Sequence, residues 1–338
     1  MTSALPGGVS LPAFRRHLQR VLLAGLVAVT GMAPVTAAAF DKFVALGTSS
    51  TSGVYFPVGN AICDLINAGR LDHLMRCLSY STGGSVYNIQ ALTSGELDIA
   101  ITRSDLAYEA YLGKGQFAAL GANRDLRTVA NLYGQPVAVI VKADSGIDGF
   151  DKFDGRRINI GNRGSGKRTI ADMIFRIMGW TNDRFGKVTE LSTGAMGRAF
   201  CAGEVDILIE ALGIPAAFYD RMTRECGGRF VSLPPELVAG FKATGPFFYD
   251  DRIGGDLYPH NPADVNTVGI KIVLVTVARV HPRSIGIVAD AMFGKLDDFR
   301  AAHSALSRAT VDSMLKEGIH VPIHPGADAY YRQRNLLP

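Results

Sequence analysis

The sequence predicts an α/β protein of two lobes joined by two extended crossover strands, and three observations support this prediction. Short β-branched runs alternate with helical patterns along the chain, which is typical of βαβ units in a mostly parallel sheet. The alternation restarts after a long apolar run at residues 135–141, and a second long apolar run at residues 268–277 offers the return crossing. A single large Rossmann-type sheet is the alternative arrangement.

The first βα-rich segment contains three predicted strands and two predicted helices. The strands lie at residues 43–46, 77–80 and 98–101. The helices lie at residues 57–67 and 86–92. Each strand is short and apolar, and a helical pattern follows each of the first two.

The second segment repeats this order. A strand at residues 157–160 precedes a Gly-rich loop and a helix at residues 168–178, and another strand follows at residues 205–209. The tail from His281 is largely helical in pattern. We therefore expect lobe 1 at residues 40–137 and 265–338 and lobe 2 at residues 138–264.

The first 39 residues have the pattern of a secretory signal peptide. Arg15, Arg16 and Arg20 precede an apolar run at residues 21–32, and small residues follow at 35–39. The run is shorter than the roughly 20 residues that span a bilayer. We expect cleavage just before Phe40 or one or two residues earlier, and a mature protein in the periplasm; a buried N-terminal helix is the alternative.

The charge of the mature chain excludes two classes of partner. The full chain has a net charge of +4, but without the three leader arginines 32 basic residues stand against 31 acidic ones, a net charge of +1. A nearly neutral surface argues against nucleic acid or an anionic membrane as the partner. About 300 residues are enough for two lobes with their own cores.

Four cysteines remain in the mature chain, namely Cys63, Cys77, Cys201 and Cys226. An even number in an exported protein indicates two disulfides, for which the sequence alone allows three pairings. A zinc site is the alternative, but no CxxC or His-rich spacing supports it. We expect no bound metal.

Three loops share one design, in which a short strand ends in Ser, Thr and Gly residues and a helix begins at once. They lie at residues 47–53, 81–85 and 161–166. A helix N-terminus presents unpaired N–H groups and a partial positive charge, so it binds a carboxylate or phosphate. Ligands in open α/β sheets bind at the carboxyl ends of strands. The loops therefore predict a site for a small organic anion.

The third loop also resembles a nucleotide-binding P-loop, because residues 161–167 fit GxxxxGK. Arg168 stands where the magnesium-binding Ser or Thr belongs, and Thr169 comes one residue too late. We therefore expect neither nucleotide hydrolysis nor any cofactor. Lys167 could still serve as a cation for an anionic ligand.

Three further side chains are candidate ligand contacts. Arg103 follows the strand at residues 98–101 and could bind a carboxylate in bidentate fashion. Glu210 follows the strand at residues 205–209 and could accept a hydrogen bond from a ligand ammonium or hydroxyl. Tyr55 could cover the ligand. Since GxSxG and HExxH are absent and the seven histidines are scattered, we expect no catalysis.

The whole mature chain resembles the TAXI family of solute receptors, which serve TRAP transporters. The matching segments are GTSSTSGVYFPVGNAICDLIN from Gly47, STGGSVYNIQALTSGELDIAITRSD from Ser81, KADSGIDGFDKFDGRRINIGNRGSGKR from Lys142, FCAGEVDIL from Phe200 and LDDFRAAH from Leu296. The resemblance implies a type II periplasmic-binding fold with a venus-flytrap cleft. It also implies the local disulfides Cys63–Cys77 and Cys201–Cys226, and a transporter with large and small membrane subunits, which are often fused.

The resemblance implies a ligand such as glutamate, a 2-oxo acid or a dicarboxylate. It places ten residues at or near that ligand: Thr48, Ser49, Tyr55, Thr82, Gly83, Ser85, Ser104, Asn162, Ser165 and Gly166. Arg103, Lys167 and Glu210 stand where relatives commonly carry other residues, which leaves the identity of the ligand open. We expect a monomeric receptor that binds no nucleic acid; a sensing receptor for a signalling partner and an exported enzyme are the alternatives.

Overall fold

The computed structural model describes residues 1, 2 and 43–337. The predicted leader, residues 1–39, lies outside this range apart from its first two residues. The chain divides after Ala39, and the fold is that of the unit from Phe40 onward. Within the described residues, no helix is both long and apolar enough to cross a membrane.

Three parallel strands form the sheet of the first lobe, in the order β2-β1-β3. They are β1 (Phe43–Gly47), β2 (Arg76–Tyr80) and β3 (Ile99–Arg103). The helices that follow them are α2 (Tyr55–Ala68), α3 (Arg70–His73), α4 (Ser85–Ser94) and α5 (Ser104–Leu112), with the short helix η1 (Gly115–Leu120) after them. The predicted strands and helices of this segment are confirmed within a few residues at each end.

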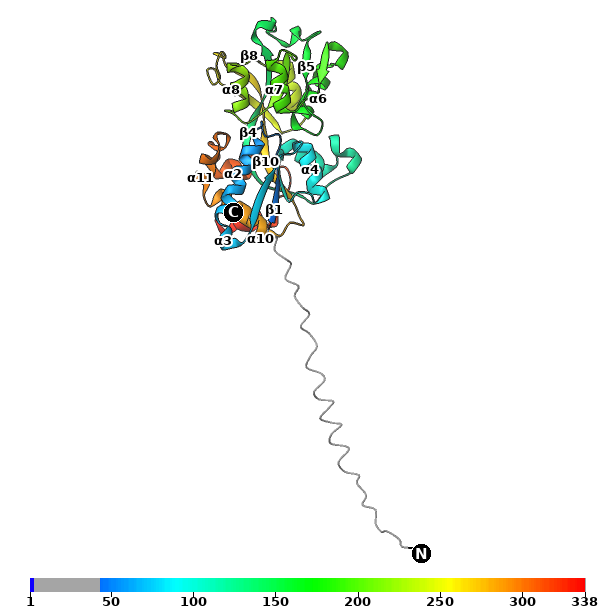
Figure 1. The fold of residues 1–338 in the computed structure, drawn as a ribbon, viewed down its shortest axis with the longest axis vertical. Helices are drawn as coiled ribbons and strands as arrows, with labels where there is room; N and C mark the ends of the chain where they lie inside the picture. The colour runs from blue at the N-terminus through cyan, green and yellow to red at the C-terminus, as the bar shows by residue number, and fades with distance from the viewer. Residues whose placement is uncertain (3–42, 338) are drawn as a thin grey trace. The chain divides into compact units, whose positions relative to one another are not determined.

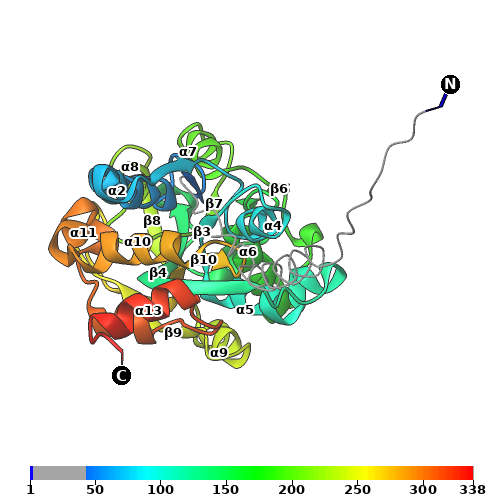
Figure 2. The ribbon, with the colours of Figure 1, turned by 90° about the horizontal axis from the view of Figure 1, so that it is seen from below.

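The C-terminal tail is helical, as predicted, and completes the first lobe. Its helices are α10 (Pro282–Phe293), α11 (Leu296–Ala302), α12 (Val311–Lys316) and α13 (Pro325–Gln333). Figure 2 shows α10 and α13 side by side. Both helices begin at a proline, which favours the first helical turn, and a histidine side chain caps each of them, His281 for α10 and His324 for α13.

Two long antiparallel strands connect the lobes, β4 (Leu126–Lys142) and β10 (Val265–Val277). Figure 1 shows them where the elements of the two lobes meet. β10 pairs with β3 and with β9 (Phe248–Ile253), whereas β4 pairs with β7 (Ile207–Ala211) and β8 (Gly228–Val231). These four pairings and the pairing of β4 with β10 are all antiparallel, so the prediction of a mostly parallel sheet is wrong. A chain that crosses between lobes and returns must run in opposite directions.

The second lobe is built on β7, β5 (Arg157–Asn159) and β6 (Lys187–Thr189), with β5 parallel to both neighbours. Its helices are α6 (Gly166–Met178), α7 (Thr193–Cys201), α8 (Ala217–Arg224) and α9 (Pro235–Ala243). α6 begins where the Ser165 side chain accepts a hydrogen bond from the backbone N–H of Arg168, and it ends at Gly179 with φ 67°. These are the usual start and stop signals of a helix.

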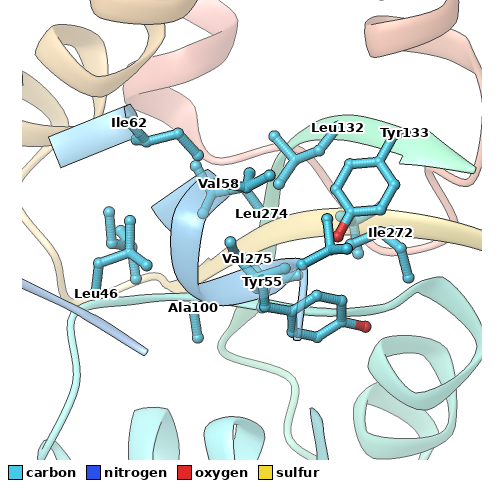
Figure 3. Close-up of a cluster of buried hydrophobic side chains, with 14 of the residues drawn as sticks. Leu46, Tyr55, Val58, Ile62, Ala100, Leu132, Tyr133, Ile272, Leu274 and Val275 are labelled. Carbon is cyan, nitrogen blue, oxygen red and sulfur yellow. The ribbon is translucent and has the colours of Figure 1, made fainter. Parts of the chain in front are cut away.

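Two hydrophobic cores lie on this framework. The second core contains Val137, Val139 and Val141 of β4 together with side chains of the second lobe such as Phe153 and Phe241. The first core fills the first lobe and continues along the other face of β4. Figure 3 shows part of it, in which α2 residues lie against β10. The prediction of a two-lobed α/β protein is confirmed, and the exact lobe boundaries stay a prediction.

Both locally paired disulfides are present. Cys63 of α2 is bonded to Cys77 of β2, with the two Cα atoms 4.9 Å apart. Cys201, at the end of α7, is bonded to Cys226, just before β8, with a Cα separation of 4.7 Å. Each bond therefore ties a helix to a nearby strand within one lobe.

Candidate functional site

A small cavity lies between the two lobes, with a volume of ≈ 70 Å³. The first lobe contributes Ser49, Ser50, Gly53, Tyr55, Thr82, Gly83, Gly84 and Ser85; β4 contributes Gln135; the second lobe contributes Asn162, Ser165, Gly166, Lys167, Ser192, Thr193, Glu210, Ala211 and Leu212. One water needs about 10–15 Å³ on this scale, so the cavity has room for a molecule of several non-hydrogen atoms.

The structure brings together ten of the thirteen predicted ligand contacts in the wall of this cavity. They are Ser49, Tyr55, Thr82, Gly83, Ser85, Asn162, Ser165, Gly166, Lys167 and Glu210. Thr48, Arg103 and Ser104 are buried but do not line it. All three predicted loops contribute to the wall, so residues far apart in the sequence converge as expected.

Thr48 holds the first loop in place from behind the cavity. Its backbone N–H and its Oγ1 both donate to the carbonyl of Tyr80, at 3.0 and 2.6 Å. Its own carbonyl accepts hydrogen bonds from Thr82 Oγ1 at 2.9 Å and Asn88 Nδ2 at 2.7 Å. The first and second loops are therefore fixed to each other, and Thr82 is held at the cavity wall.

Hydrogen bonds join the two lobes beside the cavity. The Gly164 carbonyl of the second lobe accepts from the backbone N–H groups of Val86 and Tyr87, in the first turn of α4, at 3.1 and 3.2 Å. Asn162 Nδ2 donates to the carbonyl of Gly83 at 3.3 Å. Gly84 has φ 104°, and a Cβ atom there would lie 3.4 Å from the Cα of Ser165. That distance is an ordinary van der Waals contact, so the backbone conformation, and not the space between the lobes, favours glycine here.

Arg103 connects the lobes instead of facing the cavity. Its side chain is fully buried and forms an ion pair with Asp105, in which Nε donates to Oδ1 at 3.1 Å. Its Nη1 donates across the interface to the Gly166 carbonyl and to Thr169 Oγ1, the latter at 2.6 Å. Because Asp105 neutralises the guanidinium, Arg103 adds hydrogen bonds between the lobes but no uncompensated charge.

Lys167 and Glu210 form a second buried ion pair, in the cavity wall itself. Lys167 Nζ lies 2.8 Å from Glu210 Oε2, and the two side chains are 6% and 3% exposed. Thr193 Oγ1 donates to the same carboxylate oxygen at 2.8 Å, and the backbone N–H of Ala211 donates to the other at 3.0 Å. The ionisable lining residues therefore carry one positive and one negative charge, side by side.

Three helix N-termini meet at the cavity. Ser85 begins α4, Gly166 begins α6 and Thr193 begins α7, and all three residues are in the wall. In α4 the N–H groups of Val86 and Tyr87 already donate to Gly164. The N-termini of α6 and α7 carry the partial positive charge that stabilises an anion without a full cation. Hydroxyl groups beside them add donors. The arrangement is suited to holding a carboxylate.

Tyr55 lies at the first-lobe side of the cavity. Its hydroxyl is 3.3 Å from Ser85 Oγ. Burial raises the pKa of the Tyr55 hydroxyl well above its usual value, although the hydrogen bond with Ser85 acts in the opposite direction. Tyr55 therefore remains neutral and offers a hydroxyl group on an aromatic wall.

Sequence reasoning did not identify eight of the lining residues as ligand contacts: Ser50, Gly53, Gly84, Gln135, Ser192, Thr193, Ala211 and Leu212. Gln135 carried a signal, because it is a polar residue beside an apolar strand pattern. Thr193 carried one as well, since Ser192-Thr193-Gly194 has the composition of the three predicted loops and stands at the start of a helix.

Two other findings concern metal binding and the choice of site. Among the described residues, no group of three or more His, Cys, Asp or Glu side chains is placed to hold a metal ion. A larger hollow of ≈ 960 Å³ lies around Trp180, Arg229 and His260. It takes its lining from residues 148–265 alone and includes none of the three predicted loops, so we place the candidate site in the cavity between the lobes.

Comparison with known proteins agrees with this architecture. The model of the NMT1-like family matches residues 46–334. MatC from Rhodopseudomonas palustris, solved with bound malate, is similar with a TM-score of 0.53 at 14% identity, over 87% of this chain and 96% of that one. The binding protein component of an ABC phosphonate transporter from Pseudomonas aeruginosa is similar with a TM-score of 0.53 at 11% identity, over 79% of each chain. The predicted fold of a type II periplasmic binding protein is confirmed.

Proposed function

Since the chain belongs to the NMT1-like family, we propose that it is an extracytoplasmic solute-binding receptor. It captures a small organic anion between its lobes, delivers it to the large and small membrane subunits of a TRAP transporter, and catalyses no reaction. The observation that carries this proposal is the cavity between the lobes, whose wall combines polar groups of both. Such a wall can form around a ligand only when the lobes meet.

The relatives support an anionic ligand. MatC is described with bound malate, and the protein from Pseudomonas aeruginosa is described as a component of a phosphonate transporter. Both ligands are small anions. The resemblance of the loops to TAXI receptors favours a TRAP permease as the partner, rather than the ABC transporter of the Pseudomonas protein.

The cavity wall favours a ligand that carries charges of both signs. A carboxylate can accept hydrogen bonds from the first turns of α6 and α7, where partial positive charge gathers. An ammonium group can lie near Glu210, the acidic lining residue, which shares its charge with Lys167. A glutamate-like amino acid fits both requirements; a 2-oxo acid or a dicarboxylate would use the donors alone.

Binding and release require the lobes to separate. Opening breaks the hydrogen bonds of Gly164, Asn162 and Arg103 across the interface, and the two crossover strands are the segments that bend. A ligand that contacts both lobes stabilises the closed state over the open one, because it loses half of its contacts on opening.

A thermal-shift screen of ligand-stripped protein tests the proposal. Amino acids, 2-oxo acids, dicarboxylates and nucleotides with magnesium are compared at equal concentration. A ligand at 100 times its dissociation constant adds roughly 2.7 kcal/mol of stability and raises the melting temperature by a few degrees. A shift with small acids supports the receptor, whereas a shift with a magnesium nucleotide alone overturns it. Uptake of the binding acid into vesicles that hold the TRAP subunits, dependent on this protein, tests the partner.

A further inference from the structure

Gln135 of β4 is a lining residue to which the fold gives no structural partner. Its side chain is 3% exposed and lies in the cavity wall. Its Oε1 is buried and has no hydrogen-bond partner among the residues that the structure describes. A buried carbonyl oxygen without a donor destabilises a folded protein, so the amide is expected to have a partner that the fold itself does not supply.

The position of Gln135 on β4 explains why it faces the cavity. Alternate residues of a strand share a face, which places Tyr133, Gln135 and Val137 on one face of β4. Tyr133 belongs to the first core and Val137 to the second. Gln135 lies between them in the sequence, where the strand passes from one lobe to the other. An apolar side chain would continue the pattern of the strand.

We propose that Gln135 is a specificity-determining residue that accepts a hydrogen bond from a hydroxyl or amino group of the ligand. This inference rests on the proposed function. Most polar groups of the wall can donate, including its Ser and Thr hydroxyls, the helix N-termini and Lys167. The Glu210 carboxylate already accepts from Lys167, Thr193 and the backbone of Ala211. Among the lining residues, Gln135 Oε1 is a buried acceptor for which the described residues provide no donor.

The ligand classes that follow are hydroxy acids and amino acids. Their hydroxyl or amino group fills the acceptor while their carboxylate binds the donors. An unsubstituted acid or a 2-oxo acid has only acceptors, so it leaves Oε1 buried and unpaired. A site that hydrogen-bonds a hydroxyl or amino group of its ligand strongly rejects analogues that lack this group. Gln135 is thus expected to work mainly by lowering the affinity for acids that lack a hydroxyl or amino group.

Three matched pairs of acids test the proposal by calorimetry: L-lactate with propionate, L-malate with succinate, and L-glutamate with glutarate. In the pair that fits the cavity, the acid with the hydroxyl or amino group binds wild type at least tenfold more tightly. Gln135→Met keeps the length of the side chain but removes the acceptor, and its discrimination within that pair falls to about twofold or less. Its melting temperature without ligand rises by about 2 °C, since a buried unpaired carbonyl is gone.

Two further variants keep the test decisive. Gln135→Glu retains an acceptor and is expected to retain the discrimination within the pair, even if overall affinity for anions falls; it also serves if Gln135→Met does not fold. Asn131→Leu is the matched control, because Asn131 is also buried on β4 and its Oδ1 also lacks a partner, yet it is not in the cavity wall. Its discrimination should equal that of wild type.

Each result decides one of the two proposals. If wild type binds one of these acids but does not distinguish the members of its pair, or if Gln135→Met distinguishes them as wild type does, the role of Gln135 is overturned and the receptor function stands. If none of the six acids binds wild type and the wider screen also fails, both are overturned.

Discussion

Lys167 and Glu210 form an ion pair in the wall of the cavity, with Nζ 2.8 Å from Oε2 and with both side chains buried. The sequence placed each of them singly at the ligand. Because they pair, neither charge is free. The loss of folding stability on substituting one residue therefore depends on whether the other is present.

Removal of one partner should destabilise the protein far more than removal of both. Lys167→Met or Glu210→Gln leaves a buried charge without its partner, which costs about 3–5 kcal/mol. The double variant Lys167→Met with Glu210→Gln should lose much less than the sum of the two. Urea unfolding of the four proteins measures this coupling. Strictly additive losses would show that the pair does not exist in solution.

Arg103 should govern affinity without touching the ligand. Arg103→Lys keeps a positive charge beside Asp105, but an ammonium group cannot reproduce the bidentate contact together with the bonds to Gly166 and Thr169. These bonds exist only when the lobes meet, so their loss favours the open state and weakens ligand binding about tenfold or more. Calorimetry with the tightest acid of the screen measures it.

The control for this prediction is Arg224→Lys. Arg224 lies on α8 and pairs with Asp220 of the same helix, with its side chain 60% exposed. Its substitution should leave affinity unchanged. Equal affinity of wild type and Arg103→Lys would contradict the role of Arg103 in closure.

His324 should make the protein sensitive to mild acid. Its Nδ1 accepts from the backbone N–H of Gly326 and its Nε2 lies 3.1 Å from the carbonyl of Val280, an arrangement that suits the neutral ring. Burial lowers the pKa of His324 from 6.5 to about 4, aided by nearby Arg127 and opposed by the bond to Val280. A lowered pKa means that the unfolded state binds the proton first, so its contribution to stability is complete above pH 6.5 and is lost as the pH falls toward 4.

Urea unfolding between pH 7.5 and about pH 4 tests this prediction. His324→Asn can still cap α13 but cannot titrate, so its stability should fall less steeply over that range than that of wild type. Parallel profiles for the two proteins would exclude His324 as a source of the acid sensitivity.

Each disulfide should contribute stability through the loop that it closes. The two loops span sequence separations of 14 and 25 residues, for which the chain-entropy model gives about 3 kcal/mol each. The paired substitutions Cys63→Ala with Cys77→Ala and Cys201→Ala with Cys226→Ala should each lower the midpoint of urea unfolding. Reductant should lower the midpoint of wild type, and should not lower that of a variant that lacks all four cysteines.

The sequence was most informative where structure depends on neighbouring residues. The strand at residues 43–46 and the helix that follows it are set by local apolar pattern and by Pro57, and the structure confirms them as β1 and α2. Whether the strands pair parallel or antiparallel could not be predicted from neighbouring residues. β4 and β10 run antiparallel because the chain crosses between the lobes twice, and no pattern within either strand encodes its partner.

The same distinction holds for the candidate site. The three loops were predictable, because a strand end, a run of Ser, Thr and Gly residues and a helix start are adjacent in the sequence. Arg103 was placed at a strand end correctly, but its contacts with Gly166 and Thr169 lie more than 60 residues away. Gln135 faces the cavity only because β4 passes there from one core to the other.

Calorimetric titration of ligand-stripped protein with the acid that gives the largest thermal shift tests the central claim most directly, when wild type is compared with Ser192→Phe. Ser192 lines the cavity, and its side chain makes no capping hydrogen bond to α7, so a phenyl group there fills the site at little structural cost. The account predicts one molecule of acid per wild-type chain and no measurable binding to a folded Ser192→Phe variant. Equal binding to both proteins would contradict it, because the ligand would then lie outside the cavity between the lobes.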